Sequence, residues 1–409
     1  MSYHFFLFLF INKLNIIINK KNKMNIFLVP FYIAYNLFCF FILNKYFFFF
    51  LVIWSILSYF LVKKIFQSVE KYKNAPKEVQ EKYPDFIRRD WANWNFTKIY
   101  IGAIFFSWIK LLGVLFVIVS IWLHFKIITR GKDIYNVTDK TFKDKVKSVA
   151  AFWARLFLVF TGIIVNNLEV DADYSKYLGK DYLKEVENKK AKEKYCCIIS
   201  NHVSWVDILI MMSFNGSGFI TSNAVKSFPF IGTVCTLLGS IYIDRASKEN
   251  RNEILNQVSK KLQAINDEKD LSNICIFAEG TTSNGSCFLP FKKGAFGNLL
   301  PVKPMVIKIE TKEKVSLAMD IIEMVSHLII VCCIPLHFID LQQFPVFTPN
   351  EYFIKEYIPK NKPEGKSDWY VYSEVVREIM SQHSGIKKGK QYYEDKVELL
   401  GILRGKKNQ

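Results

Sequence analysis

The sequence lacks the residue patterns of several common kinds of site. Its eight cysteines include no Cys-x-x-Cys pair and no accompanying histidine pattern, so neither a zinc site nor a catalytic cysteine is indicated. Most of these cysteines lie in apolar runs, which predicts buried, reduced thiols. No internal repeat is evident, and no recognised nucleic-acid-binding motif is present. We therefore expect no bound metal ion and no nucleic-acid partner.

Acidic residues are scarce beside basic ones. The 409-residue chain contains 37 Asp and Glu against 55 Lys and Arg, which gives a formal net charge of +18. Aromatic residues make up 16% of the chain, and its 37 phenylalanines are frequent in the long apolar blocks near the N-terminus. In a chain with such blocks, a basic excess usually indicates affinity for anionic lipid headgroups. Composition therefore predicts a membrane protein with the bilayer and its phospholipids as partners.

The N-terminal region, residues 1–66, is predicted to be a membrane anchor. Residues 1–23 have no small-residue cleavage site, so a cleaved secretory signal is not favoured, and whether they belong to the mature protein stays open. Two apolar runs follow, Ile26–Leu43 and Phe47–Val62, each near the lower length limit for crossing a bilayer. Lysines flank the pair on both sides, which places both ends in the cytosol. We expect a helical hairpin over 26–62, with one long kinked helix as the alternative.

The middle of the chain predicts an α/β domain over residues 149–345. Short apolar runs alternate with helical stretches, a pattern typical of a mostly parallel central sheet flanked by helices. The expected strands are Ile163–Val170, Tyr195–Ser200, Gly218–Thr221, Ile241–Ile243, Ile274–Phe277, Val302–Ile309 and Val331–Leu336. The expected helices between them are Val206–Ser213 and Asn250–Ile265, with an amphipathic stretch over Leu317–Ile330. Residues 346–409 are expected to be a C-terminal extension, with a surface helix over Ser367–His383 and a basic tail.

A histidine and an aspartate stand at the end of one expected strand. His202 follows the apolar run that ends at Ile199, and Asp207 comes five positions later. On one continuous helix, positions five apart point about 140° away from each other, so this pair can meet only across a turn. Ser204-x-x-Asp207 has the spacing of a helix capping box, which supplies that turn. A neutral imidazole held by a carboxylate is a general base, whereas the simpler interpretation is a loop histidine and a helix cap.

Four ordered blocks follow one another along this part of the chain, namely Asn201–Asp207, Gly239–Arg245, Phe277–Gly285 with its continuation Phe291–Phe296, and Val302–Val306. Together they resemble the glycerolipid acyltransferase family, whose first block is His-x4-Asp. The resemblance is closest to the branch that acylates lysophosphatidylcholine and lysophosphatidylethanolamine, and it covers roughly Asp85 to the C-terminus. Tyr242 and Ala278 depart from the commoner Phe and Pro of that family, and neither is a reacting group.

The resemblance implies a role for each matching residue. His202 would be the general base for the hydroxyl of a lysophospholipid, and Asp207 would orient its imidazole. That hydroxyl would attack the thioester of acyl-CoA, a cosubstrate, with no cofactor. The residues implied in substrate binding are Gly239, Arg245, Glu279, Gly280 and Thr281. Lys226, Lys292 and Lys293 are candidate lipid or CoA contacts, and Pro304 is implied to be structural.

A third apolar block, Ile99–Phe125, affects whether the site is expected to face the cytosol or the lumen. It lies in a predicted linker region, 67–148, behind a polar segment expected on the surface, Val69–Asn95. One further crossing here would place the four blocks in the lumen. The last four residues match a dilysine retrieval signal that is read from the cytosol, and the sequon at Asn284 would put a lumenal glycan at the site. We therefore expect a re-entrant or interfacial helical pair over 99–125, and a cytosolic site on the endoplasmic reticulum.

Three functions stay open at this stage. The first is acyl-CoA-dependent acylation of lysophosphatidylcholine or lysophosphatidylethanolamine in phospholipid remodelling. The second is acylation of lysophosphatidic acid to phosphatidic acid. The third is a non-catalytic lipid-binding membrane module of the same fold. Headgroup, acyl-chain preference and oligomeric state are not encoded in the blocks.

Overall fold

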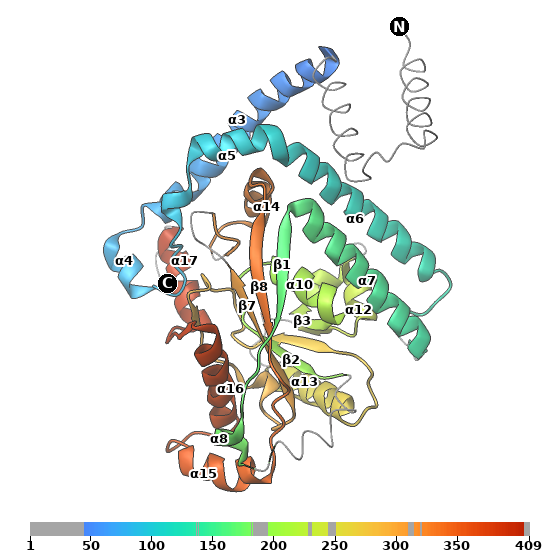
Figure 1. Ribbon diagram of the computed structural model, residues 1–409, viewed down its shortest axis with the longest axis vertical. Coiled ribbons are helices and arrows are strands. Elements are labelled where there is room, and N and C mark those ends of the chain that lie inside the picture. Colours follow the sequence, from blue (N-terminus) through green and yellow to red (C-terminus); the bar gives the residue numbers. More distant parts are fainter. Residues whose placement is uncertain are drawn as a thin grey trace, which may run out of the picture. The chain divides into compact units, whose positions relative to one another are not determined.

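The computed structural model describes residues 45–135, 137, 139–180, 182, 195–227, 231–243, 251–309, 315–319 and 321–404 (Figure 1). Residues 1–23, the apolar run Ile26–Leu43 and the terminal dilysine lie outside these residues. The chain divides into two units, Met1–Leu57 and Ser58–Gln409. The helix α3 (Lys45–Lys73) begins in the first unit, and every other described element belongs to the second.

A seven-stranded sheet forms the centre of the second unit, with the strand order β1-β8-β7-β2-β5-β3-β4. All neighbouring strands are parallel except the antiparallel pair β7 and β8. The expected α/β fold with a mostly parallel central sheet is confirmed. The strands are β1 (Ile163–Glu169), β2 (Cys197–Ser200), β3 (Gly218–Ser222), β4 (Ile241–Ile243), β5 (Ile274–Phe277), β7 (Val302–Ile309) and β8 (His337–Gln343).

Helices cover both faces of this sheet, because its central strands are apolar on both sides. Ile198 of β2 packs into one buried cluster, and its neighbour Ile199 packs into the other. The first face is covered by α7 (Lys140–Thr161), α10 (Val206–Asn215) and α12 (Ile231–Leu237), and the second by α13 (Arg251–Asn266) and α16 (Asp368–Ser384). Figure 1 shows α7 and α10 on one side of the sheet and α16 on the other.

Two expectations about the C-terminal half are wrong. The helix over 368–384 is not a surface helix, because Tyr372, Val376 and Met380 are fully buried in the core. The apolar run Val331–Leu336 is not a strand. Its first three residues end α14 (Met324–Cys333), and the strand β8 begins only at His337.

The polar stretch Val69–Asn95 is also not a surface segment. Its aromatic side chains at Tyr83, Phe86 and Trp94 are at most 5% exposed and pack with α14 and α17 (Tyr393–Leu403) into a third buried cluster. The short helix α4 (Lys77–Lys82) precedes these residues, and a 3-10 turn (Trp91–Asn93) lies among them. Residues before and after the α/β domain therefore build one layer together.

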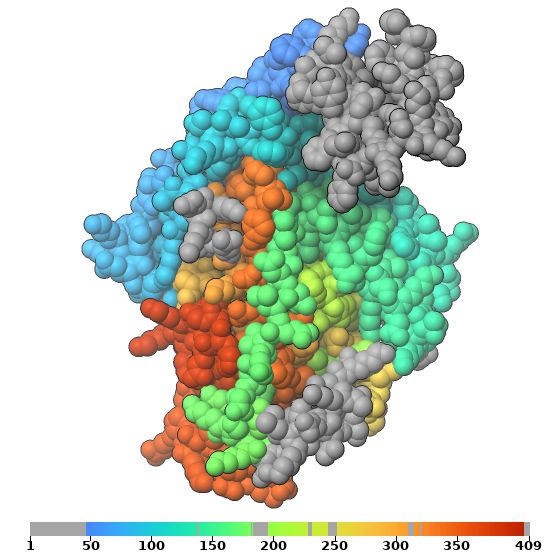
Figure 2. Space-filling model, viewed as in Figure 1, coloured from blue at the N-terminus to red at the C-terminus, as the bar shows by residue number. Residues whose placement is uncertain are grey.

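A long apolar helix replaces the expected pair over 99–125. The helix α5 (Phe96–Gly102), a π-helical turn (Ala103–Ser107) and α6 (Trp108–Ile128) form one continuous run of 33 residues. By length and composition, this run and the run Tyr46–Lys73 of α3 are each sufficient to cross a membrane. The run packs along α14, and the two lie side by side in Figures 1 and 2.

Lys110, in the middle of this helix, has a structural role. Its ammonium donates to the backbone carbonyls of Thr161, Ile334 and Pro335 at 2.5–2.8 Å. Thr161 ends α7 and Ile334 caps α14, so one cation stabilises the negative ends of two helices. A lysine inside an apolar block is explained by these contacts.

Candidate functional site

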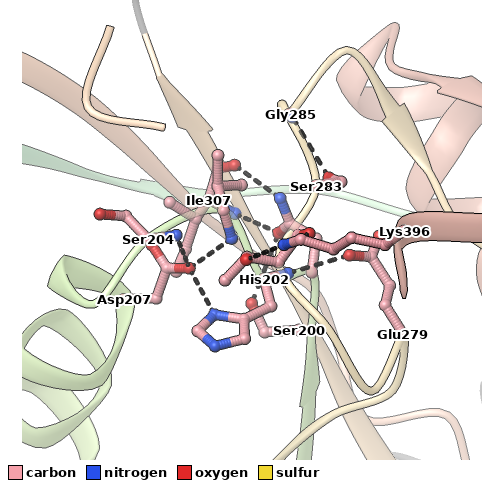
Figure 3. Close-up of polar contacts among 12 residues, drawn as sticks. Ser200, His202, Ser204, Asp207, Glu279, Ser283, Gly285, Ile307 and Lys396 are labelled. Atoms are coloured by element: carbon pink, nitrogen blue, oxygen red, sulfur yellow. Dashed lines mark hydrogen bonds and ion pairs between the residues drawn. The ribbon is translucent and has the colours of Figure 1, made fainter. Parts of the chain in front are cut away.

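The sheet brings His202 and Asp207 together at one edge. Ser200 is level with Phe277 of β5 and Met305 of β7, so β2 and β5 both end at this edge. The chain then turns, and α10 begins at Val206. Across that turn, His202 Nδ1 lies 2.9 Å from Asp207 Oδ2 (Figure 3). The expected strand, loop and helix are therefore present, and the predicted pair is in contact.

Asp207 holds the loop as well as the imidazole. The residue is completely buried, and its Oδ2 also accepts the backbone N–H groups of Val203 at 2.6 Å and Ser204 at 2.8 Å. Only half of the predicted capping box forms. Asp207 accepts from the Ser204 backbone, but in the described part of the chain the buried Ser204 Oγ has no hydrogen-bond partner. The carboxylate therefore fixes the loop that carries the histidine.

The histidine ring has a defined tautomer and one available nitrogen. Because a carboxylate only accepts, Nδ1 carries the proton in the neutral ring and Nε2 keeps its lone pair. One face of the ring stacks on Phe277, with 4.1 Å between centroids and an angle of 11°. The side chain remains 20% exposed. This arrangement suits a general base that receives a proton at Nε2.

Two further contacts position the same loop. The Asn201 amide pairs with the backbone of Ile307 in β7, donating at 2.9 Å and accepting at 2.8 Å. On the other side, Trp205 Nε1 donates to Nδ1 of His327 at 3.0 Å. Burial lowers the pKa of His327 to about 3, so this ring is neutral and can accept. Sequence reasoning assigned no role to Asn201 or His327, because both partners come from elements distant along the chain.

Glu279 supports the backbone of His202. It is 1% exposed, and its two carboxylate oxygens accept the N–H of His202 at 3.2 Å and of Leu289 at 3.0 Å. Figure 3 shows Glu279 beside the His202 backbone, while the imidazole extends toward Asp207. Its neighbour Gly280 has a φ of +71°, and a side chain there would collide with Lys292. Glu279 therefore supports the loop that carries His202, and the implied place of Glu279 and Gly280 in substrate binding stays a prediction.

We expect Glu279 to make stability depend on pH. Burial raises its pKa from an ordinary 4.5 to about 8, against the opposing effect of its two N–H donors and Arg377. A carboxyl whose pKa is raised on folding stabilises the fold at low pH, and this contribution is lost as pH rises through about 8. The melting temperature of the wild-type protein in detergent should fall relative to that of Glu279→Gln between about pH 5 and pH 9. Parallel melting curves across that range would contradict this assignment.

The loop after Glu279 is held by residues from both ends of the domain. The Lys396 ammonium on α17 is buried and bonds the carbonyl and hydroxyl of Thr282 at 2.7 and 2.6 Å. The Asn284 amide donates to the carbonyls of Pro84 and Ile87 at 2.8 and 2.7 Å. A glycan on this nitrogen would replace one of its two hydrogens, so at least one of these bonds would be lost. The sequon is therefore incompatible with glycosylation in this fold.

The other predicted residues are more dispersed. Gly239 lies just before β4, at the amino end of that strand, where a side chain would meet Lys261 at 2.7 Å, and its place in the substrate site stays a prediction. Lys226 is exposed and lies over Tyr135 and Tyr242. Arg245 lies outside the described residues. Thr281 is half-buried in the held loop, and Lys292 and Lys293 are exposed just beyond it.

Pro304 lies inside the sheet, where a missing N–H is usually costly. Its carbonyl accepts from Phe344, on the side of β8. The nitrogen of a strand residue faces the same side as its carbonyl, so an N–H at this position would face Phe344 and return that bond. The proline therefore lacks one ladder bond, and the register with β8 begins at the next residue, Met305.

Residues 179–308, which include this site, match the family model for Acyltransferase. These residues are an acyltransferase-family domain. They contain the predicted blocks, from His202 to Val306, which confirms the resemblance.

Curated relatives align with the same part of the chain. The lysophospholipid acyltransferase LPEAT1 of Arabidopsis thaliana is 30% identical over 195 residues, 47% of this chain and 46% of that protein. The lysophosphatidylcholine acyltransferase of Drosophila melanogaster is 23% identical, over 51% of this chain and 36% of that one. A 1-acyl-sn-glycerol-3-phosphate acyltransferase of Neisseria gonorrhoeae is 31% identical, over 27% and 42%. The chain thus spans less than half the length of each of these relatives.

Among solved structures, the chain aligns with the 1-acyl-sn-glycerophosphate acyltransferase PlsC from Thermotoga maritima. That alignment has a TM-score of 0.43 and 16% identity, and covers 69% of this chain and 98% of that one.

Proposed function

We propose that this protein transfers a fatty acyl chain from acyl-CoA to the free hydroxyl of a lysophospholipid. The observation that carries the proposal is the 2.9 Å contact between His202 Nδ1 and Asp207 Oδ2, which leaves Nε2 of a partly exposed ring as a base. An imidazole oriented in this way accelerates proton transfer by a factor on the order of 10² to 10⁴. The acyltransferase-family domain around it supports this chemistry over a simple loop histidine.

The proposed reaction is a direct displacement. Nε2 of His202 accepts the hydroxyl proton while the hydroxyl oxygen bonds to the thioester carbon. The tetrahedral intermediate then expels the CoA sulfur, which recovers that proton from the imidazolium. Asp207 stabilises the imidazolium during this exchange, at the distance that it already holds. No covalent acyl-enzyme is needed in this scheme.

Lysophosphatidylcholine and lysophosphatidylethanolamine are the proposed acceptors. The Arabidopsis and Drosophila relatives named for lysophospholipid and lysophosphatidylcholine support this choice. The Neisseria relative named for 1-acyl-glycerol-3-phosphate keeps lysophosphatidic acid as the alternative acceptor. In either case we assign the acceptor's phosphate to Arg245, a planar bidentate donor.

Membrane attachment is the second part of the proposal. The outward side chains of the helix 96–128 include Phe105, Leu112, Leu115 and Ile127, each 55–71% exposed. A soluble protein rarely leaves so continuous an apolar surface in water. We propose that this surface lies in the bilayer without the helix crossing it, and that the enzyme works on the cytosolic side of the endoplasmic reticulum. The role of Asn284 within the fold supports a location away from the glycosylation machinery.

The test is CoA release by the purified chain in lipid nanodiscs, with a panel of lysophospholipids. Acceptor-dependent CoA release, with the matching diacyl lipid as product, is the expected result. Best turnover with lysophosphatidic acid would move the assignment to the alternative acceptor. No turnover with any lysolipid, from protein with an intact melting transition, would favour the non-catalytic lipid-binding module.

A further inference from the structure

A cavity that we call the C-terminal cavity lies apart from the His202–Asp207 pair, neither of which lines it. Its volume is about 400 Å3. Three segments line it, namely Pro290–Phe291 after the held loop, the start of α16 around Trp369, and the stretch 389–392. The catalytic proposal makes no use of this cavity. Two of its three walls come from the C-terminal extension, beyond the residues that match the family model.

The charge of this cavity favours an anion. Lys366, Lys390 and Arg377 line it, and the one carboxylate among its lining residues is Glu374. Glu374 already bonds Arg377 at 3.0 Å. That leaves the exposed ammonium groups of Lys366 and Lys390 at the rim. Lysines in this position are suited to phosphate groups as point charges.

The inner part of the cavity provides a second polar feature. Arg377 is 5% exposed, and its Nη2 donates to the carbonyl of Phe288 at 2.8 Å. Within the described part of the chain, its buried Nε–H has no hydrogen-bond partner. A buried donor without an acceptor is costly, so a ligand oxygen that reached it would be stabilised.

Aromatic side chains form much of the remaining wall. Trp369, Tyr370 and Tyr392 line the cavity, and the Tyr392 ring is 51% exposed. Phe291 is fixed behind them by stacking on Phe296 at 6.0 Å and 8°. Flat rings beside lysines suit a nucleobase and its phosphates, because bases stack on aromatic rings and phosphates pair with ammonium groups.

Hydrogen bonds and side-chain contacts join the wall of the cavity to the loop after Glu279. Lys292, next to Phe291, donates its N–H to the carbonyl of Ala278, the residue before Glu279. The Lys292 side chain lies against Gly280, and its ammonium is 5.3 Å from the ring centre of Tyr393. Tyr393 follows Tyr392 of the cavity. An extended ligand could therefore have one end in the cavity and the other near His202.

We propose that the C-terminal cavity binds the phosphorylated adenosine end of the CoA thioester. The inference rests on the proposed function, because it takes acyl-CoA as the donor. Lys366 and Lys390 would contact the phosphates, Trp369 and Tyr392 the base, and Arg377 an oxygen of the ligand. The pantetheine arm would then pass Gly280 and Lys292 and bring the thioester to Nε2 of His202.

Binding of free CoA, measured by calorimetry on the full chain in nanodiscs, tests this directly without any turnover. Lys366→Ala with Lys390→Ala should weaken CoA binding by about tenfold or more, since two charge-assisted contacts are lost. The control pair is Lys355→Ala with Lys360→Ala, two exposed lysines that pair with Glu351 and Glu356 outside the cavity. Equal CoA affinity in wild type and the cavity variant, or no CoA binding by wild type, would overturn the inference.

A kinetic measurement separates this inference from the proposed function. The ratio of kcat/KM for acyl-CoA to that for acyl-pantetheine, which lacks the nucleotide, should fall about tenfold in the cavity variant. An unchanged ratio in an active enzyme would remove the cavity assignment and leave the acyltransferase proposal intact. ATP that binds in the cavity without competing with CoA would make it a regulatory nucleotide site, which also contradicts the donor assignment. A wild type that binds CoA through these lysines yet acylates no lysolipid would refute the proposed function alone.

Discussion

Replacing His202 by alanine is expected to lower acyl transfer by about a hundredfold or more, because a general base contributes at least that factor. The change removes the only group in the 2.9 Å contact with Asp207 that can accept the hydroxyl proton. The fold should persist, since the ring is 20% exposed and the loop is held by backbone bonds to Asp207 and Glu279. The measurement is CoA release at saturating lysolipid, together with the melting temperature.

The matched control for this substitution is His383→Ala. His383 is exposed on α16, and its Nδ1 contacts the carbonyl of Ile379 in its own helix. The same chemical change is thus made away from the ends of β2 and β5, where His202 lies. Activity should therefore stay near that of the wild type. Comparable turnover of His202→Ala and His383→Ala would mean that His202 is an ordinary loop histidine. The displacement mechanism would then be wrong.

Two of the strands that the sequence predicted correctly are easy to recognise. β2 and β5 are almost entirely buried, so they are continuous apolar runs bounded by polar turns, and β7 has the same pattern from Pro304 to Ile307. β8 is different, because His337, Asp340 and Gln342 interrupt it beside the edge strand β1. The sequence instead predicts a strand in the apolar run just before β8, Val331–Leu336. It is the end of the buried helix α14, and a run this short fits either structure.

The candidate site likewise has one part that the sequence predicted and another part that it did not. His202, Asp207 and Glu279 occur in contiguous blocks, so their proximity follows from parallel strand ends. The contacts that support them do not follow from the blocks. Lys396 reaches Thr282 across 114 positions, and Asn201 reaches Ile307 across 106. Such pairs leave no local pattern, and charged residues in polar stretches are ordinarily expected in solvent.

Arg88 is the clearest example of such a hidden support, and its loss should be among the most destabilising single changes. It is 2% exposed in the stretch expected on the surface, and its Nε lies 2.6 Å from Asp90 Oδ1. Its guanidinium also donates to the carbonyls of Ser316 and Ala318 at 2.7 and 2.5 Å. The next residue, Met319, donates its N–H to the carbonyl of Val203, beside His202. The buried Arg88–Asp90 ion pair therefore lies between the N-terminal layer and the loop that carries His202.

Arg88→Met should lower the free energy of unfolding by about 3–5 kcal/mol, because it leaves the Asp90 carboxylate buried without its cation. This corresponds to a fall in melting temperature of roughly 5–10 °C for a domain of this size. The adjacent Arg89 is exposed and donates to the carbonyl of Pro84, so Arg89→Met serves as the control and should change little. Neutralising the partner, in Arg88→Met with Asp90→Asn, should recover part of the loss if an unpaired charge is its cause. Additive losses in the double variant would show that lost packing against Trp94, 5.1 Å away, is responsible instead.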